Sequence, residues 1–207
     1  TLLRGGFPPS ALASDDEVSY RWREAFLSTY IQRDLPMLGL RSSAVATQRL
    51  LTMCAHLQGQ VLNMAMLSAS LGISGPTLRA NLDFLQEALL VRLLAPWSGN
   101  LRKRLVKSPK LYIRDSGLCH VLLGIRSVDD LMAHPVFGSS WEALCVETLC
   151  NSFPKATPSY FRTANGAEID LVLDQGTKRV AIECKASTAP ALTRGFYNAC
   201  ADLQPDH

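Results

Sequence analysis

Residues 159–186 contain three short runs at strand-like spacing, and this stretch constrains the fold most strongly. The runs are Ser159–Thr163, Ala167–Asp174 and Arg179–Ala186. Asn165-Gly166 lies between the first two, and this dipeptide is a strong signal for a hairpin turn. The pattern therefore predicts a small β-sheet in the last third of the chain.

A predicted helix lies on each side of these strands. Ser139–Phe153 has apolar residues at helical spacing and is closed by Pro154, and Pro190–Leu203 follows the last strand. Helix, three strands and helix together predict a small α/β core, and residues 127–207 are expected to form the second domain.

The preceding part of the chain is predicted to be mainly helical. Val18–Leu35, which Pro36 is expected to stop, and Val45–Leu57 have apolar stripes at helical spacing. A helix-turn-helix follows, with a tight turn at Gly72 and a second helix capped near Ser74, in the string LSASLGISGPTLRANLDFL.

A β-hairpin is predicted after the helix pair. Its strands are Val91–Trp97 and Lys110–Arg114, with Ser98-Gly99-Asn100 as a turn. Helix-turn-helix plus hairpin is the outline of a winged helix, so residues 1–126 are expected to form a helical and winged-helix domain. The chain is thus predicted to be an α+β or α/β protein of two domains.

Positive charge is concentrated in the middle of the chain. Residues 91–126 carry eight basic side chains and one acidic side chain, whereas residues 127–207 carry six basic and ten acidic ones. A local basic surplus attracts polyanions. The candidates for binding nucleic acid or an acidic partner lie on the predicted hairpin: Arg102, Lys103, Arg104, Lys107 and Lys110.

The predicted recognition helix is poor in side chains that read DNA. Arg79 is its one basic residue, beside Asp83 and Glu87. A winged helix that docks a protein is therefore favoured over one that reads a DNA sequence.

The composition predicts a cytoplasmic protein without a membrane partner. No apolar run approaches the ~20 residues that a membrane span needs. The six cysteines form no CxxC pair and lie within apolar patterns, which is typical of reduced, buried thiols. Neither a disulfide framework nor a structural zinc site is expected.

Strand alternation brings three polar side chains to one place. The apolar residues of the second strand are expected to share one face: Ile169, Leu171 and Leu173. Asp170 then lies on the opposite face, and Glu183 and Lys185 project together from the third strand. If the two strands pair, Asp170 joins Glu183 and Lys185.

Glu142 is a fourth candidate, on the helix before the strands. It shares helical spacing with the apolar stripe of Cys145, Val146 and Leu149. A carboxylate on a buried face is costly unless a cation pairs with it. A metal ion or a catalytic lysine would provide that cation.

Carboxylate oxygens of this kind suit Mg²⁺ or Mn²⁺. A bound metal lowers the pKa of water and neutralises charge on a phosphate, and a lysine stabilises developing negative charge. Taken alone, Glu183 and Lys185 are more simply a surface salt bridge. Glu168 and Asp174 are expected to be solvated charges at strand ends.

The arrangement of Glu142, Asp170 and Glu183-Cys184-Lys185 resembles the PD-(D/E)xK nuclease superfamily. Nearly the whole chain is also similar to an uncharacterised domain that follows predicted AAA-type ATPases of bacteria and archaea. The strings that carry this similarity are GGFPP, YIQRDL, KRLVKSPKLYIRDSGL, WEALCVETL, FRTANGAEIDLVL and IECKAS.

The resemblance implies roles for these residues. Asp170 and Glu183 would bind the metal, with the Cys184 carbonyl as a third ligand. Lys185 would be catalytic and Glu142 a supporting acid. No GxxxxGK(S/T) motif occurs, so this chain is not expected to bind ATP. The superfamily core normally ends in a further strand, so this αβββα core is expected to be truncated.

Two functions remain open from the sequence. The first is a metal-dependent nuclease-like module acting on DNA or RNA beside a missing N-terminal ATPase domain. The second is a catalytically inactive nuclease fold plus winged helix that docks DNA or a protein partner of the ATPase.

Overall fold

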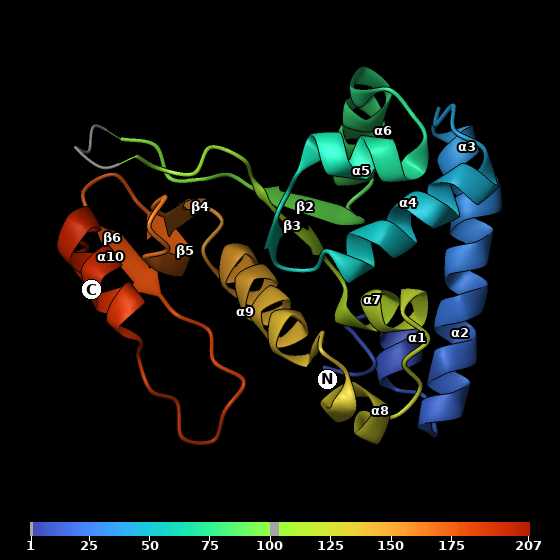
Figure 1. Cartoon of the computed structure of the whole chain (residues 1–207). Coiled ribbons are helices and arrows are strands. Elements are labelled where there is room, and N and C mark those ends of the chain that lie inside the picture. Colours follow the sequence, from blue (N-terminus) through green and yellow to red (C-terminus); the bar gives the residue numbers. More distant parts are fainter. Residues whose placement is uncertain (1, 100–103) are drawn as a thin grey trace.

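The computed structural model describes residues 2–99 and 104–207 and has an α+β fold (Figure 1). The helices of the first half of the chain and the first sheet lie at one end of the molecule. The second sheet lies at the other end, and α9 lies between them. No helix of the described residues is both long and apolar enough to cross a membrane.

The first half of the chain is helical, as the apolar spacing predicts. Its helices are α1 (Pro8–Ala11), α2 (Asp16–Thr29), α3 (Leu35–Met37), α4 (Ala44–His56), α5 (Met64–Leu71) and α6 (Gly75–Glu87). A π-helical turn over Tyr30–Asp34 joins α2 to α3, and the helical path continues past Pro36. The helical path ends at Met37, one residue after Pro36, so the predicted stop is displaced by one residue. The wider π turn leaves room for the proline ring that an α-helical carbonyl would meet.

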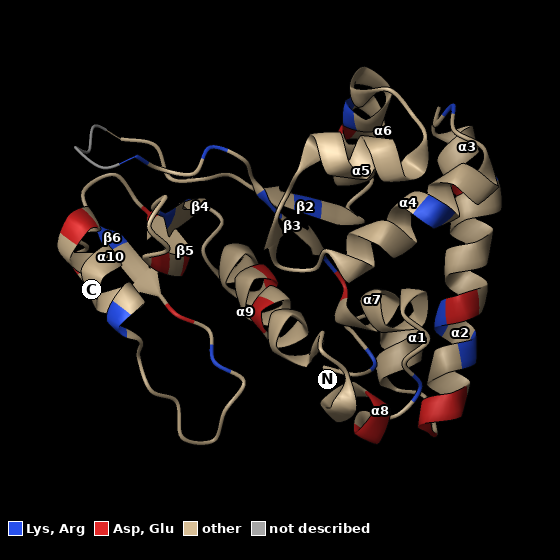
Figure 2. Ribbon diagram, in the orientation of Figure 1, with Lys and Arg blue, Asp and Glu red and all other residues tan. Residues whose placement is uncertain are grey.

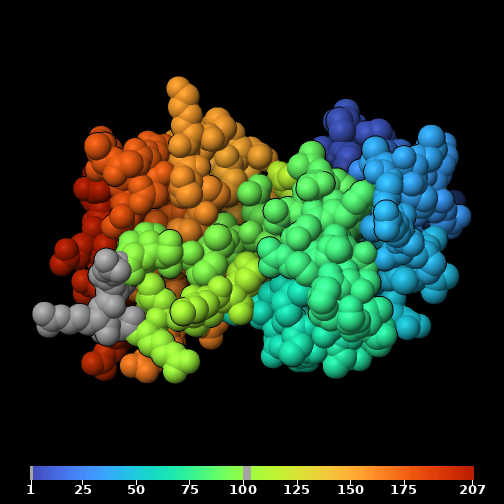
Figure 3. Space-filling model, turned by 90° about the horizontal axis from the view of Figure 1, so that it is seen from above, coloured from blue at the N-terminus to red at the C-terminus, as the bar shows by residue number. Residues whose placement is uncertain are grey.

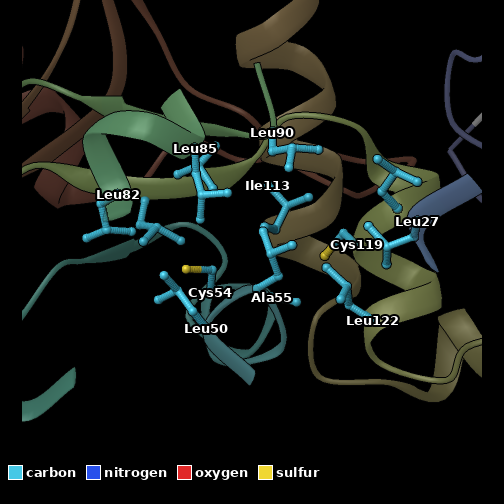
Figure 4. Close-up of a cluster of buried hydrophobic side chains, with 14 of the residues drawn as sticks. Leu27, Leu50, Cys54, Ala55, Leu82, Leu85, Leu90, Ile113, Cys119 and Leu122 are labelled. Carbon is cyan, nitrogen blue, oxygen red and sulfur yellow. The ribbon is translucent and has the colours of Figure 1, made fainter. Parts of the chain in front are cut away.

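The predicted turn between α5 and α6 is confirmed. Gly72 has φ +67°, a left-handed conformation that favours glycine. The Ser74 side chain accepts a hydrogen bond from the Thr77 amide and so caps α6. Leu67, Leu78 and other residues of this pair enter the main apolar core, part of which Figure 4 shows.

The first sheet is antiparallel and contains the predicted hairpin strands. Its order is β1-β3-β2, with β1 at Gln60–Val61, β2 at Val91–Leu94 and β3 at Lys110–Ile113. Ile113 packs among the side chains of α4, α6 and α7 (Ser116–Leu122) (Figure 4).

The segment between β2 and β3 forms an extended arm that pairs with the second sheet. We call residues 95–99 and 104–109 the arm. The Trp97 amide donates to the Tyr160 carbonyl at 2.7 Å, and the Val106 amide donates to the Arg162 carbonyl at 2.9 Å. Figure 3 shows the green and lime arm packed beside the orange C-terminal part. The arm therefore lies along a sheet edge rather than standing free as a wing.

The second sheet has the order β4-β5-β6, with all pairs antiparallel. Its strands are β4 (Thr157–Arg162), β5 (Glu168–Asp174) and β6 (Arg179–Ile182). The helices α9 (Phe137–Ser152) and α10 (Arg194–Leu203) contribute to separate apolar clusters on it, and α8 (Val128–Ala133) precedes α9.

A β-bulge in β5 changes the predicted sharing of faces. Ser159 pairs with Val172 and Phe161 pairs with Ile169, so two residues of β5 oppose one of β4. Leu171 and Leu173 consequently pack in the cluster with α9, whereas Ile169 packs in the cluster with α10. The prediction that Ile169 shares a face with the two leucines is wrong, because regular alternation does not survive the extra residue.

The third strand is shorter than predicted. It ends at Ile182, so Glu183, Cys184 and Lys185 follow β6 instead of lying within it. The last helix also begins later than predicted, at Arg194. Asp170 still reaches this segment, because its Oδ2 accepts a hydrogen bond from the Cys184 amide at 2.9 Å.

Candidate functional site

The four residues that the sequence singled out lie in one connected cluster of charged groups. Asp170 accepts the Cys184 amide, between Glu183 and Lys185. Lys185 Nζ lies 2.6 Å from Glu183 Oε1. Glu142 on α9 is linked to Asp170 through an ammonium group that both carboxylates contact. Figure 2 shows acidic residues on α9, on β5 and in the segment after β6.

That ammonium group belongs to Lys110, the first residue of β3. Its Nζ lies 2.9 Å from Glu142, 2.7 Å from Glu168 and 3.3 Å from Asp170. The side chain is only 3% exposed. The sequence placed Lys110 with the surface cations of the hairpin. The prediction that Lys110 binds nucleic acid or an acidic partner is therefore wrong, because an enclosed ammonium with three carboxylate partners cannot reach a surface phosphate.

Tyr112 is a second contributor from β3 that the sequence reasoning missed. Its hydroxyl donates a hydrogen bond of 2.6 Å to Glu142 Oε1, the same oxygen that Lys110 contacts. Lys110 and Tyr112 are two residues apart on a strand and so face the same side. That alternation is a signal in the sequence, but it does not identify the carboxylates that the strand would meet.

Glu168 is also a member of the cluster, contrary to its expected place as a solvated charge. It pairs with Lys110 and, at 3.3 Å, with Arg162 of the neighbouring strand. Asp174 was also expected to be a solvated charge at a strand end, and it is the last residue of β5 with a side chain that is 28% exposed. It pairs with Arg179 at 3.1 Å at the far end of β5.

The charges of this cluster are strongly coupled through burial. Burial disfavours the charged form of Lys110, yet the carboxylates of Glu142, Glu168 and Asp170 outweigh it and raise the pKa of the ammonium. Burial raises the pKa of Glu142, and the positive charge of Lys110 counteracts part of this increase. Lys110 therefore remains a cation at neutral pH and stabilises the ionised Glu142.

Glu183 has the least satisfied carboxylate of the cluster. Its side chain is 7% exposed, and among the described residues its Oε2 has no hydrogen-bond partner. Burial raises the pKa of Glu183, and the Asp170 charge adds to this effect against the opposing hydrogen bond from Lys185. That hydrogen bond also raises the pKa of Lys185, whose side chain is 33% exposed and carries an accessible positive charge next to Glu183.

The donor set fits a divalent cation held by few protein ligands. No group of three or more His, Cys, Asp or Glu side chains is arranged around a metal position in the described part of the chain. Mg²⁺, however, is commonly held by one or two carboxylates while waters and phosphate oxygens complete its shell. Asp170 and Glu183, with a buried oxygen that lacks a partner, match that kind of site.

The basic candidates divide into three groups. Arg104 and Lys107 are exposed on the arm, and Lys110 is enclosed in the carboxylate cluster. Arg102 and Lys103 lie outside the described residues.

Two larger hollows lie away from the cluster. One of about 850 Å³ is lined by α2 and α4, and another of about 620 Å³ is lined by Phe7, Phe26, Tyr30 and part of α9. The site residues line neither hollow. Among the members of the cluster, Lys185 is partly exposed, with 33% of its side chain accessible.

Two families match the chain, each over one part of it. Residues 1–129 match the family described as Domain of unknown function (DUF8612), and residues 137–207 match Domain of unknown function (DUF4143). Lys110 and Tyr112 lie in the first matched part, whereas Glu142, Asp170 and Glu183 lie in the second. The cluster is therefore shared between the two matched regions.

Two curated relatives are uncharacterized proteins of Mycobacterium tuberculosis and Mycobacterium bovis. Each is 41% identical over 202 residues, which is 98% of this chain and 46% of the relative. The chain thus spans about half the length of these relatives. The search of solved structures gave no significant match.

Proposed function

The chain belongs to the family described as Domain of unknown function (DUF8612), and from its carboxylate cluster we propose that it is a nuclease-like module that hydrolyses phosphodiester bonds with a divalent metal. In this proposal the chain is the C-terminal region of an ATPase of the AAA type, and its substrate is DNA or RNA. The relatives are about twice as long as the chain, which leaves room for such a domain.

The observation that carries the proposal is the pairing of Asp170 with Glu183 beside an accessible lysine. The carboxylates of Asp170 and Glu183 interact electrostatically, one oxygen of Glu183 is buried without a described hydrogen-bond partner, and Lys185 lies 2.6 Å from Glu183. An ionised carboxylate oxygen that is buried alone is costly. A bound cation would remove that cost, and this makes metal binding the simplest use of the arrangement.

Each residue has a role in the proposed reaction. Asp170 and Glu183 would hold Mg²⁺ or Mn²⁺, which would supply charge neutralisation on a phosphate and a more acidic water. Lys185 stays protonated because its pKa is raised. It therefore donates hydrogen bonds to the developing negative charge instead of accepting a proton. Glu142 is held by Lys110 and Tyr112 and supports Asp170 from α9.

The order of elements supports the finer fold assignment within this proposal. The run α9-β4-β5-β6-α10 agrees with the αβββα core of the PD-(D/E)xK superfamily, and α5-α6-β2-β3 agrees with a winged helix. Both assignments belong to the proposal.

A second candidate function is favoured by the contacts of Lys110. This ammonium already pairs with three carboxylates, so part of the acidic charge is compensated without any metal. A nuclease fold that has lost activity and docks DNA or a protein partner would tolerate such compensation. Arg104 and Lys107 on the arm would then contact the partner.

Hydrolysis of labelled single- and double-stranded DNA and RNA with Mn²⁺ separates the two functions. We expect the wild-type chain to cleave at least one of these substrates. Lys185→Gln should lower the rate by about 10²-fold or more, because a charged donor to the transition state is lost. Lys155→Gln removes an exposed lysine outside the cluster and is the matched control.

Cleavage that persists in Lys185→Gln would contradict the assigned role of Lys185. A folded wild-type chain that cleaves none of the substrates, with or without Mn²⁺, would favour the docking function.

A further inference from the structure

Lys110 occupies the point at which three carboxylates converge. Its ammonium contacts Glu142 from α9 and both Glu168 and Asp170 from β5, at distances between 2.7 and 3.3 Å. The aromatic ring of Tyr160 covers another side, 5.6 Å from Nζ. The cation is thus enclosed on several sides by groups that attract positive charge.

Three converging carboxylates would otherwise require another cation. Like charges at such short separations cannot all be ionised unless a positive charge lies among them. Hard oxygen ligands in this arrangement are also what a divalent cation prefers. Nucleases with two metals place the ions about 3.5–4 Å apart.

The cluster therefore has one position that a cation fills and a second where a carboxylate oxygen has no described partner. At one, Lys110 contacts Glu142, Glu168 and Asp170. At the other, Glu183 presents a buried oxygen without a described partner beside the same Asp170. Asp170 is common to both, because one of its oxygens contacts Lys110 and the other accepts the Cys184 amide.

We propose that Lys110 is a resident cation that takes the place of a second metal ion, so that the site binds one divalent cation instead of two. This inference rests on the proposed function for the first metal, at Asp170 and Glu183. Lys110 is a positioning residue in this arrangement: it acts on Glu142 and Asp170 and does not touch the substrate.

The position of Lys110 in the chain extends the inference. The lysine comes from β3, in the region that matches one family, and the carboxylates come from the region that matches the other. The number of metals bound by the second region is then set by a residue of the first.

The number of bound Mn²⁺ ions tests the proposal, measured by calorimetry and equilibrium dialysis on the whole 207-residue chain. Lys110→Met keeps the length of the side chain and removes its charge. We expect one ion in the wild type, two in Lys110→Met, and one in the control Lys155→Met, which loses an exposed lysine. Lys110→Arg keeps the charge and should bind one ion.

Other numbers of bound ions distinguish the claim that Lys110 replaces a metal from the claim that Asp170 and Glu183 bind one. Two ions in the wild type, or one ion in both wild type and Lys110→Met, would overturn the resident cation. No ion in the wild type but one in Lys110→Met would support the resident cation and reject the first metal site. No ion in either protein would reject both.

A folding defect in Lys110→Met is also informative. If this variant is unfolded in EDTA, refolding in millimolar Mn²⁺ would support the proposal, because the metal would replace the lost ammonium. Failure to refold in Mn²⁺ would overturn it.

Discussion

His120 joins the start of the chain to α9 through both nitrogens of its ring. Nδ1 lies 3.0 Å from the Leu3 carbonyl, and Nε2 lies 2.7 Å from Ser140 Oγ. A carbonyl can only accept, so Nδ1 carries the proton and Nε2 accepts from the serine. Burial lowers the pKa of His120 to about 4, and the nearby Arg23 and His134 charges act in the same direction. The folded protein therefore keeps this imidazole neutral.

The free energy of unfolding should consequently decrease as the pH is lowered from about 6.5 to about 4. The folded pKa lies below the unfolded value of about 6.5, so the unfolded chain takes up the proton first. The contribution of His120 is complete above pH 6.5 and is lost as the pH falls toward about 4, by up to about 3 kcal/mol. Urea unfolding of wild type and His120→Gln at pH 4 to 8 measures it.

The difference in stability between these two proteins should shrink as the pH falls. A difference that stays constant from pH 8 to pH 4 would mean that His120 is not held neutral. Ser140→Ala is a useful companion variant, because it removes one partner and leaves the imidazole in place.

The turn after α6 has a leucine in a conformation that favours glycine. Leu89 has φ +60° and is 67% exposed. The Leu89 amide donates to the Gln86 carbonyl and the Leu90 amide to the Leu85 carbonyl, which is the Schellman pattern at the end of a helix. A Cβ in this left-handed position costs free energy that glycine avoids.

Leu89→Gly should therefore raise the free energy of unfolding by about 0.5–1 kcal/mol. Chemical denaturation of this variant and of Leu89→Ala, which keeps the Cβ, measures the effect of backbone strain. Destabilisation by glycine beyond that of alanine would show that the turn is not strained.

The pairing of the arm with β4 predicts a stability effect of the backbone alone. The Val106 amide donates to the Arg162 carbonyl at 2.9 Å. Val106→Pro removes this donor and should lower the free energy of unfolding by about 1–3 kcal/mol more than Val106→Ala. Equal effects of the two substitutions, by urea denaturation, would indicate an arm that does not depend on this pairing.

Elements were easier to predict from the sequence than the faces they present. The turn at Gly72 and the hairpin at Asn165-Gly166 follow from local chemistry, so the sequence reveals them. The bulge at Asp170 and Leu171 does not, because it depends on how β4 meets β5. A period of two residues therefore misplaced Ile169. It also put Asp170 on the face opposite Leu171 and Leu173, whereas Asp170 and Glu142 of α9 contact the same ammonium group, so Asp170 lies with these leucines on the α9 side.

At the scale of the whole molecule, one apolar cluster is built from both matched regions. Leu94 and Tyr112 of the first sheet pack with Ala143 and Val146 of α9 and with the second sheet. Arg92 and Arg114 also pair with Glu147 on α9. The second sheet thus depends on side chains from residues 1–129 for part of its core.

Residues 137–207 should not fold cooperatively as a separate fragment. Loss of Leu94 and Tyr112 exposes the cluster, and loss of Lys110 leaves three carboxylates without their cation. We expect circular dichroism of this fragment to show no cooperative thermal transition, and coexpression with residues 1–136 to restore one. A cooperative transition in the fragment alone would contradict this dependence.

In the candidate site, too, the residues that are close in sequence could be predicted, whereas the residue that a tertiary contact brings in could not. Asp170, Glu183 and Lys185 are close in sequence, and Glu142 lies on the adjoining helix, so local spacing was enough to group them. Lys110 reaches them from β3. The predicted strand includes Lys110 and leaves out the exposed Lys107, but this local pattern does not identify the carboxylates that Lys110 meets. Its role depends on a tertiary contact that only the folded chain provides.

Mn²⁺ calorimetry on the wild type and Glu183→Gln tests the metal site most directly, with Asp174→Asn as the control on the same sheet. Glu183 supplies the buried oxygen without a described partner, whereas Asp174 pairs with Arg179 at the far end of β5. We predict one Mn²⁺ ion bound to the wild type and to Asp174→Asn, and an affinity at least about tenfold lower in Glu183→Gln. A folded wild-type chain that binds no Mn²⁺, or a Glu183→Gln variant that binds it as tightly as the wild type, would contradict the proposed metal site.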